Sequence, residues 1–314
     1  MARVLHSDEI PIDTALVRAL VARSLPHHAA TPVRRLAASG STNVLFRLGD
    51  ELLVRLPRQP GGSAAIRKEA TWLPVVRPRL PVAVPEVVAV CGPDHGYPEH
   101  WSVVRWLDGD HPEVVIPETP VDPRREVLAR DLAAVLTALS QLEVPPEAVD
   151  DPHLRSYRGG PLVTMDQTTR ENIERCRSLA DFPLDLDAVT RIWEDALRLP
   201  GAAEPAPPRW YHGDLTAENL LVQDGRLAAV LDFGGLAVGD PAVDLVVAWE
   251  VLDPPARELF RTQLGVDDAT WLRGRAWALC ITLMIWYYWT TMPKRRASRM
   301  AIGRNILADA GYSG

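Results

Sequence analysis

The stretch WYHGDLTAENLLV, residues 210–222, places His212, Asp214 and Asn219 between an aromatic pair and an aliphatic run. Polar groups this close to apolar segments need a structural or a chemical reason. One possibility is a polar turn, in which an aspartate side chain caps its own backbone. The other is a catalytic loop, and the residues that follow distinguish the two.

The sequence after Asn219 favours the catalytic loop. An apolar strand, a turn at residues 224–225 and a second apolar strand lead to Asp232. A hairpin of this length predicts that Asn219 and Asp232 lie side by side at the strand ends. Their amide and carboxylate oxygens are hard ligands, suited to Mg²⁺ that is also held by phosphates. Asp214 can then accept a hydrogen bond from an attacking hydroxyl, as in kinase-type phosphoryl transfer.

Length and composition are those of a globular protein and argue against several other classes. The chain has 314 residues, enough for one large bilobal domain or two ordinary ones. Its net charge of −7 and pI near 5.7 argue against nucleic-acid binding, which usually requires a basic surface. The most apolar segment, residues 276–289, is too short for a membrane span and predicts a buried helix that Pro293 ends.

Two further features bear on the compartment. The N-terminal residues lack the apolar core of a signal peptide. Cys91, Cys176 and Cys280 are widely spaced and form no metal-site or disulfide pattern. These features predict a cytoplasmic protein in a reducing environment, with neither a membrane nor a nucleic-acid partner. They leave its oligomeric state open.

The first hundred residues predict a mostly antiparallel sheet with one inserted helix. Residues 13–25 have the periodicity of an amphipathic helix, and residues 33–57 predict three strands joined by tight turns. A helix at residues 63–77 and strands near residues 85–91 and 101–106 follow.

From Asp122 onward the pattern is mainly helical, with a Pro-rich segment at residues 200–208. The sequence therefore predicts an α+β fold with two lobes. Residues 1–106, including the linker, form a small sheet lobe, and residues 107–314 form a larger helical lobe.

The stretches HGDLTAENLLV, residues 212–222, and AVLDFGGLAVGDPAVDL, residues 229–245, resemble the aminoglycoside phosphotransferase family, which has the protein-kinase-like fold. Macrolide phosphotransferases and choline kinases are relatives. The resemblance extends more weakly over essentially the whole chain. It implies a kinase that uses ATP or GTP with Mg²⁺ and phosphorylates a hydroxyl of an antibiotic, with an aminoglycoside as the leading acceptor.

The family's roles transfer position by position. Asp214 is similar to the catalytic aspartate, Asn219 and Asp232 match the Mg²⁺ ligands, and His212 matches the histidine that supports the catalytic loop.

Two further aspartates follow the motif. Asp240 and Asp244 fall where the family has structural aspartates that hold the loop backbone. Asp240 can equally be a helix cap, because it precedes Pro241, a good first-turn residue.

The resemblance implies that residues 1–106 bind the nucleotide and that residues 107–314 carry catalysis and substrate binding. A Gly/Ser turn between two strands can lay backbone N–H groups over phosphates, and its residues are Ser39, Gly40, Ser41, Thr42 and Asn43. Alone this is a weak signal, since any such hairpin looks the same.

A cation and a glutamate follow in the order found in kinases. Arg55 ends a strand, and Glu69 lies in the next helix. The family more often has lysine at the first position, and arginine is a planar fork rather than a point charge. Lys68 is the competing cation, but it falls on the polar helix face.

The segment WSVVRWLDGD, residues 101–110, passes from an apolar strand into the expected linker. In the family this connection offers backbone groups to the base. The resemblance therefore assigns the base pocket to Val103, Val104, Arg105 and Trp106. Recognition by the backbone does not distinguish ATP from GTP.

The C-terminal third carries the remaining substrate candidates. The aromatic run at residues 286–289 is expected to be mainly core, with some rings lining a pocket for a bulky substrate. Glu250 and Asp253 could add acidic groups near it. They do not decide between a cationic aminoglycoside and a more apolar macrolide or nucleoside-type acceptor.

Two other functions remain open. One is a metabolic kinase of an amino alcohol, a sugar or an amino acid. The other is a nucleotide-binding regulator without turnover, which the combined presence of Asp214, Asn219 and Asp232 disfavours.

Overall fold

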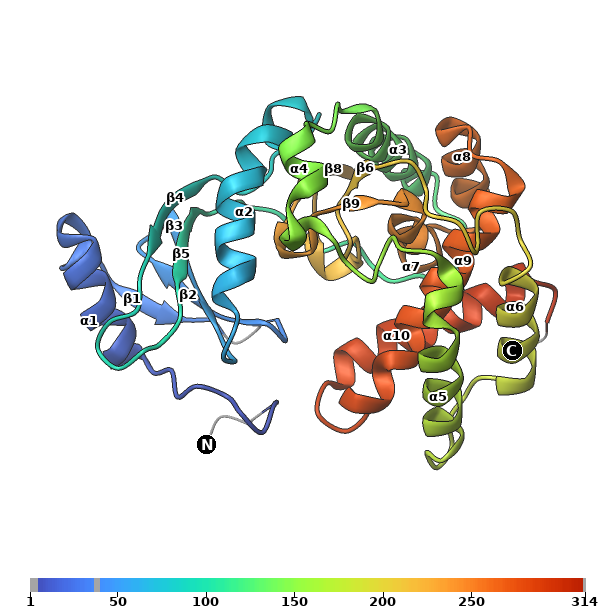
Figure 1. Ribbon diagram of the computed structural model, residues 1–314, viewed down its shortest axis with the longest axis horizontal. Helices are drawn as coiled ribbons and strands as arrows, with labels where there is room; N and C mark the ends of the chain where they lie inside the picture. The colour runs from blue at the N-terminus through green and yellow to red at the C-terminus, as the bar shows by residue number, and fades with distance from the viewer. Residues whose placement is uncertain (1–4, 37–39, 313–314) are drawn as a thin grey trace. The chain divides into compact units, whose positions relative to one another are not determined.

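The computed structural model describes residues 5–36 and 40–312, and the chain forms two compact units (Figure 1). Unit 1 consists of residues 1–78 and 84–108, and unit 2 consists of residues 79–83 and 109–314. The chain passes between the units after Pro78, after Ala83 and after Asp108.

The described part of unit 1 is built on one antiparallel sheet of five strands in the order β1-β2-β3-β5-β4. The strands are β1 Val33–Arg35, β2 Asn43–Leu48, β3 Leu52–Pro57, β4 Val87–Cys91 and β5 Trp101–Arg105. Helix α1, Thr14–Ser24, contacts β1, and helix α2, Ser63–Val76, contacts β4 and β5 (Figure 1).

The core of unit 1 lies under the central strands. Phe46 pairs with Val54, which pairs in turn with Val103, and all three side chains are fully buried. Helix α2 buries Ile66, Glu69 and Leu73, which the helical spacing of three and four residues places on one face. An acidic residue therefore lies on the otherwise apolar buried face of this helix.

Unit 2 is mainly helical in its described residues. Its helices are α3 Arg124–Gln141, α4 Pro146–Asp150, α5 Asp166–Arg177, α6 Leu186–Ala196, α7 Ala248–Val251, α8 Pro254–Leu264, α9 Asp268–Leu283 and α10 Pro293–Asp309. Two short antiparallel strand pairs complete it: β6 Arg209–Tyr211 with β9 Ala237–Gly239, and β7 Leu220–Gln223 with β8 Arg226–Val230. This architecture confirms the α+β prediction.

The β7–β8 hairpin has the turn that its sequence demands. Asp224 and Gly225 both have positive φ, +51° and +76°. Two left-handed residues in succession make the turn that matches the twist of a two-residue hairpin, and Asp-Gly is a favoured sequence for it.

The C-terminal apolar segment differs from the prediction. Helix α9 begins earlier than expected and ends at Leu283, and Met284–Tyr288 form a short 3₁₀ segment. Pro293 is the first residue of α10 rather than the end of a helix. Proline suits this position because the first helical N–H has no intrahelical partner.

The aromatic run at residues 286–289 is also not core, because it lies on that surface turn. Tyr287 is half exposed and its neighbours are partly exposed. The rings stack against arginines instead: Arg175 lies 4.2 Å from the centroid of Trp286 and Arg296 lies 5.0 Å from that of Trp289. Such cation–π contacts let large rings be covered without a core.

Two further observations concern the chain as a whole. Cys91, Cys176 and Cys280 are buried free thiols. Within residues 5–36 and 40–312, every helix is too short or too polar to cross a membrane.

The close approach of α9 to the 3₁₀ helix Pro241–Val247 depends on Gly274. A Cβ at this position would lie 2.6 Å from Leu245 Cδ1 and 2.9 Å from the carbonyl oxygen of Ala242. We expect Gly274→Ala to lower the free energy of unfolding by about 1–3 kcal/mol, because the overpacking exceeds the gain in helix propensity. Urea denaturation followed by tryptophan fluorescence measures this. Gly92→Ala is the control, since its Cβ would meet no atom within 4 Å.

Candidate active site

The loop His212–Asn219 lies between β6 and β7 in unit 2, and the buried carboxylate of Asp244 holds its start. The backbone N–H groups of His212 and Gly213 donate to Asp244 over 2.6 and 2.8 Å. Gly213 has a φ of +82°, and a Cβ there would lie 2.4 Å from the carbonyl oxygen of Gly235. Only glycine fits this turn. The predicted structural role of Asp244 is present in these bonds.

The side chain of His212 stabilises the loop through two hydrogen bonds. Its Nε2 donates to the carbonyl oxygen of Leu231 at 2.8 Å, and its Nδ1 accepts from the backbone N–H of Asp214 at 3.2 Å. The ring is fully buried and packs edge-on against Phe233, with 4.8 Å between centroids. These two bonds fix both the tautomer and the plane of the imidazole.

Asp214 presents a partly exposed carboxylate at the end of this turn. Arg158 donates from Nη1 to Asp214 Oδ1 at 2.7 Å, and Asn219 donates from Nδ2 to Asp214 Oδ2 at 3.3 Å. Burial alone would raise the pKa of this carboxyl. The nearby guanidinium groups of Arg158 and Arg299 outweigh burial and lower the pKa to about 2. Asp214 is therefore an anion at neutral pH, ready to accept a hydrogen bond.

Asn219 and Asp232 flank the open end of the β7–β8 hairpin, Asn219 just before β7 and Asp232 just after β8. The carbonyl oxygen of Asn219 accepts from the backbone N–H of Leu231, over 2.8 Å. The side-chain nitrogen of Asn219 donates to the carbonyl oxygen of Asp214 at 2.8 Å, which leaves its side-chain oxygen facing away from that bond. Asp232 has left-handed backbone, φ +54°, and a partly exposed carboxylate.

This pair of oxygen donors fits a hard cation. Magnesium is usually held by one or two protein oxygens, with phosphates and water completing its shell. A cage of three or more His, Cys, Asp or Glu side chains does not occur in the described parts of the chain. An Asn219–Asp232 site would therefore need the substrate's phosphates to complete it.

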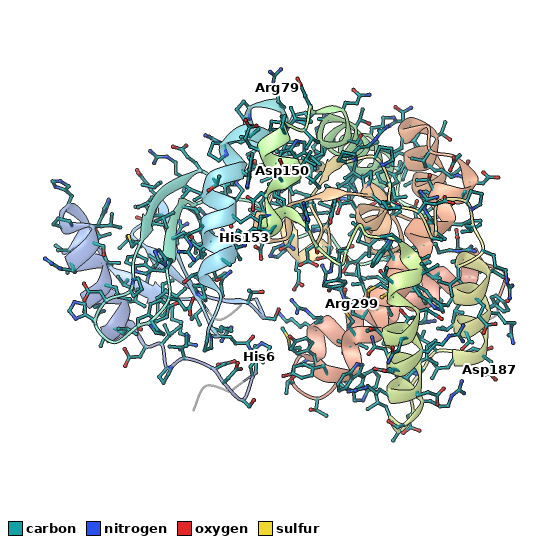
Figure 2. The ribbon with its side chains drawn as sticks, in the orientation of Figure 1. His6, Arg79, Asp150, His153, Asp187 and Arg299 are labelled. Atoms are coloured by element: carbon teal, nitrogen blue, oxygen red, sulfur yellow. The ribbon has the colours of Figure 1, made fainter. Side chains whose placement is uncertain are left out.

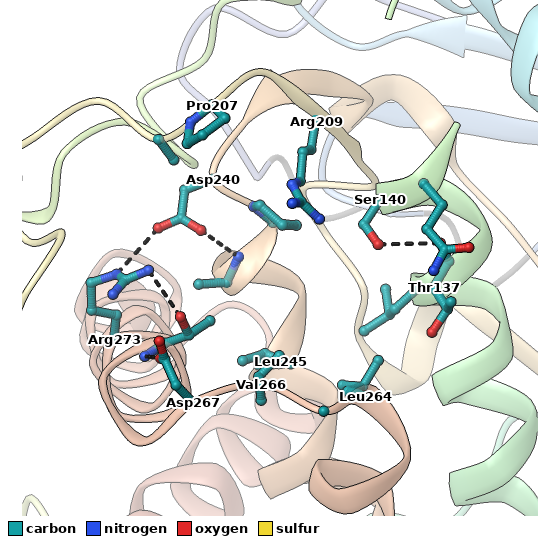
Figure 3. Close-up of a pocket in the computed structure, with 17 residues that line it drawn as sticks. Thr137, Ser140, Pro207, Arg209, Asp240, Leu245, Leu264, Val266, Asp267 and Arg273 are labelled. Atoms are coloured by element: carbon teal, nitrogen blue, oxygen red, sulfur yellow. Dashed lines mark hydrogen bonds and ion pairs between the residues drawn. The ribbon is translucent and has the colours of Figure 1, made fainter. Parts of the chain in front are cut away.

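Asp240 has a different role from Asp244. It caps the helix that begins at Pro241 by accepting from the backbone N–H of Ala242 at 3.0 Å, and it pairs with Arg273 over 3.3 Å. It lines a pocket of about 410 Å³ in unit 2 together with Arg273 and apolar side chains such as Leu245 (Figure 3). Of the two roles weighed for Asp240, the structure shows the helix cap.

The acids expected near the substrate are structural. Glu250 is buried, and it accepts from the backbone N–H of Ala217 at 2.7 Å and from the hydroxyl of Ser298. Asp253 is buried too, and it caps helix α8. Glu218, in the loop itself, pairs with Arg295 over 2.5 Å. These three carboxylates do not form an exposed acidic surface.

In unit 1, Arg55 and Glu69 form a buried ion pair. Arg55 Nη1 lies 2.6 and 2.7 Å from the two carboxylate oxygens of Glu69, and both side chains are more than nine-tenths buried. This is the pairing that the sequence order predicted. Lys68 is only partly buried on the neighbouring helix position.

The Gly/Ser turn of unit 1 is tied down through its carbonyl groups. Arg58 donates from Nε to the carbonyl oxygen of Gly40 and from its backbone N–H to that of Thr42. Asn43 is buried as the first residue of β2. Ser39 lies outside the described residues.

The strand end assigned to the base is closely integrated into the sheet. Val103 and Val104 are buried between β3 and β4. The backbone N–H groups of Arg105 and Trp106 donate to the carbonyl oxygens of Glu86 and Glu51. In this conformation these two N–H groups are therefore already used in hydrogen bonds within unit 1.

Arg158 is the residue that sequence reasoning missed. It precedes the loop by more than fifty residues, in the irregular segment before α5, and no motif surrounds it. Its contact with Asp214 depends entirely on tertiary structure.

Comparison with known proteins places the chain among phosphotransferases. Residues 33–277, more than half of the chain, match the sequence profile of the phosphotransferase enzyme family. The chain is 33% identical over 94 residues to the aminoglycoside 3′-phosphotransferase of Escherichia coli. This match covers 28% of the chain and 34% of the relative, so the chain spans about a third of the length of that curated protein.

Solved structures share the fold over nearly the whole chain. The GDP and kanamycin complex of APH(2″)-IIia has a TM-score of 0.69 at 19% identity, covering 95% of this chain and 99% of that one. A macrolide 2′-phosphotransferase type I has a TM-score of 0.63 at 21% identity, covering 94% of this chain and 98% of that one. At such identities the likeness shows the fold alone, and it confirms the predicted kinase-like architecture.

The two aspartates after the loop give a matched pair of variants. Asp244→Asn turns an acceptor oxygen into a donor that faces backbone N–H groups, so the loop should shift. We expect turnover to fall about 100-fold or more, because small displacements of a catalytic group have effects of this size. Asp240→Asn, which weakens the pair with Arg273 but does not touch the loop, should keep turnover within a few-fold of wild type. Steady-state kinetics on both variants measures this, and equal losses in the two would contradict it.

Proposed function

Because the chain belongs to the phosphotransferase enzyme family, we propose that it is a Mg²⁺-dependent kinase that moves the γ-phosphoryl group of ATP or GTP to a hydroxyl of an antibiotic, with an aminoglycoside as the first candidate. The observation that supports the proposal is the loop in which Asn219 bonds to Asp214, with Asp232 at the other side of the open end of the same hairpin. We further propose a cytoplasmic location.

Asp214 orients the acceptor hydroxyl and accepts its proton as the new bond to phosphorus forms. Asn219 and Asp232 would hold Mg²⁺, which supplies charge neutralisation on the phosphates when bound. The transition state of phosphoryl transfer is loose, so positioning and charge stabilisation account for most of the catalysis. Both are properties of a loop that Asp244 and His212 hold in place.

Residues 1–106 would bind the nucleotide and residues 107–314 the acceptor. In the first part, the Arg55–Glu69 pair places a fixed guanidinium beside the turn that ends at Asn43, and β2 and β3 pair Asn43 with Pro57, two residues beyond Arg55. Val103 to Trp106 remain our assignment for the base, with contacts from carbonyl groups rather than from the N–H groups of Arg105 and Trp106. Structural neighbours have been solved with GDP, ADP and ATP, which supports a nucleotide donor without choosing the base.

The choice of an aminoglycoside rests on relatives, among them proteins solved with kanamycin and gentamicin. A macrolide is the second candidate, and one observation favours it. The acids near the loop are already paired, Glu218 with Arg295 and Glu250 with Ser298 and a backbone N–H. A site with few unpaired carboxylates suits a less cationic acceptor, and two macrolide phosphotransferases share the fold.

We expect Asp214→Asn to reduce turnover about 10²–10⁴-fold, the usual contribution of a positioned acid–base group. Nucleotide binding should persist, since the nucleotide grip lies elsewhere. The measurement is phosphate incorporation into a panel of aminoglycosides, macrolides, amino alcohols and sugars, with calorimetry for nucleotide affinity. Asp224→Asn, at an exposed hairpin turn where asparagine also tolerates positive φ, is the matched control.

Near-wild-type turnover in Asp214→Asn would overturn the assignment. Nucleotide binding without consumption by the wild type would indicate a regulator.

Removing the metal should stop the reaction. Chelation with EDTA is expected to abolish turnover and added Mg²⁺ to restore it. Asn219→Ala and Asp232→Asn should each raise the Mg²⁺ concentration needed for half-maximal rate, because the first removes an oxygen ligand and the second replaces a charged carboxylate by a neutral amide. A metal titration of the rate checks this. An unchanged Mg²⁺ requirement in both variants would place the metal elsewhere.

A further inference from the structure

Arg158 brings a positive charge into contact with the proposed catalytic carboxylate. Its Nη1 donates to Asp214 Oδ1 at 2.7 Å and to the carbonyl oxygen of Gly213 at 2.6 Å. Its side chain is 21% exposed and that of Asp214 is 32% exposed, so the pair faces solvent on one side. Within the described residues, Nη2 of the same guanidinium makes no hydrogen bond.

The backbone around Arg158 is held firmly. The hydroxyl of Tyr211 donates to the carbonyl oxygen of Arg158, and the backbone N–H of Asp240 donates to the carbonyl oxygen of Gly159 at 2.8 Å. Gly159 has a φ of +82°, and a Cβ there would lie 2.6 Å from the Tyr211 ring. Tyr211 ends β6, immediately before the loop. Tyr211 therefore positions both the backbone of Arg158 and the start of the loop.

The side chain of Arg158 is also oriented by the residue that precedes it in the chain. Arg158 Nε donates to the hydroxyl of Tyr157 at 3.0 Å. Two nitrogens of the fork are thus used, which fixes the plane of the guanidinium and directs the third. A group placed this way loses little conformational freedom when it binds a ligand.

The other charged groups near Asp214 are committed to the protein. Arg299, on α10 (Figure 2), is buried 3.9 Å from Glu250. Its Nη1 has no hydrogen-bond partner in the described part of the chain, but this atom is enclosed by the protein and does not face solvent. His212 and Asp244 lie behind the loop and bond its backbone. Arg158 is the cation that touches the carboxylate and reaches the solvent side.

We propose that Arg158 is a catalytic residue, which contacts the transferring phosphoryl group and neutralises its charge while it holds Asp214 in position. The proposal rests on the proposed function of Asp214. A hydroxyl bound to Asp214 lies about 2.6–3.2 Å from the carboxylate, and the phosphorus it attacks lies about 3–3.5 Å beyond. The phosphoryl oxygens then fall within reach of a guanidinium that contacts the same carboxylate.

In this step the hydroxyl oxygen bonds to phosphorus and the bond from phosphorus to the leaving nucleoside diphosphate breaks. The hydroxyl proton passes to Asp214. Arg158 exchanges no proton and contributes charge and hydrogen bonds. Guanidinium groups serve in this way in other phosphoryl-transfer enzymes, where they stabilise charge on the equatorial oxygens.

A different role would be a lock, in which Arg158 occupies Asp214 until an acceptor displaces it. The lock predicts faster turnover when Arg158 is removed, and the catalytic role predicts slower turnover. The fixed backbone and the unused Nη2 favour the catalytic role, since a lock needs a segment that can move away.

The kinetic test compares Arg158→Gln, Arg158→Lys and the wild type with the best acceptor of the panel. We expect kcat of Arg158→Gln to fall about 10²–10³-fold, the usual loss for one charge-stabilising donor, with both KM values changed less than about threefold. Arg158→Lys should recover at least about tenfold, and added guanidinium ion should partly restore the Gln variant. Arg170→Gln, which removes an exposed ion-paired arginine of α5, should behave like the wild type.

A binding test separates this proposal from the function it rests on. The wild type should bind Mg²⁺ and nucleoside diphosphate more tightly when aluminium fluoride is present as a mimic of the transferring phosphoryl group. Arg158→Gln should lose at least about tenfold of that gain and keep its affinity for the diphosphate alone. Equal or faster turnover in Arg158→Gln, a Lys variant as slow as the Gln variant, or an unchanged response to aluminium fluoride would each overturn the role of Arg158. A wild type that binds nucleotide but phosphorylates no acceptor would overturn the proposed function, and the role of Arg158 with it.

Discussion

The buried carboxylate of Asp244 is the constraint on which the site depends. It receives the backbone N–H groups of His212 and Gly213 where the chain leaves β6, and it is fully enclosed by the protein. A buried anion is tolerated only when its hydrogen bonds are made, so the loop has few alternative conformations. Asp244 belongs to the 3₁₀ helix Pro241–Val247, which packs closely on α9. The packing of the helices in unit 2 therefore fixes the position of Asp244, and Asp244 in turn fixes the backbone of the loop.

Two arginine–carboxylate pairs illustrate how burial changes the meaning of the same contact. In unit 1, Arg55 and Glu69 are both almost completely buried, so their pair belongs to the interior of the unit. In unit 2, Arg158 and Asp214 are partly exposed, so both remain able to meet a substrate. A buried pair can therefore stabilise the fold, while a partly exposed pair at the surface of a loop can contact a substrate.

The net charge of the chain does not predict the charge around the loop. The chain is acidic overall, yet Glu218, Glu250 and Asp214 are each opposed by an arginine, namely Arg295, Arg299 and Arg158. Local potential follows from which side chains the fold brings within a few ångströms, because charges further apart are screened by solvent and salt. The charge that an acceptor would meet at the loop therefore depends on these arginine–carboxylate pairs and not on the net charge of the chain.

Sequence alone determined the α+β class, the order of strands and helices in unit 1, and the hairpin that joins Asn219 to Asp232. Each of these depends on local patterns: alternating apolar residues, an Asp-Gly turn and a short motif with fixed spacing. Tertiary structure alone decided that Glu250 and Asp253 are structural and that the aromatic run at residues 286–289 lies on the surface. It also brought Arg158 to Asp214 across more than fifty residues of chain. Such long-range contacts follow from how helices and loops pack, and no local pattern encodes them.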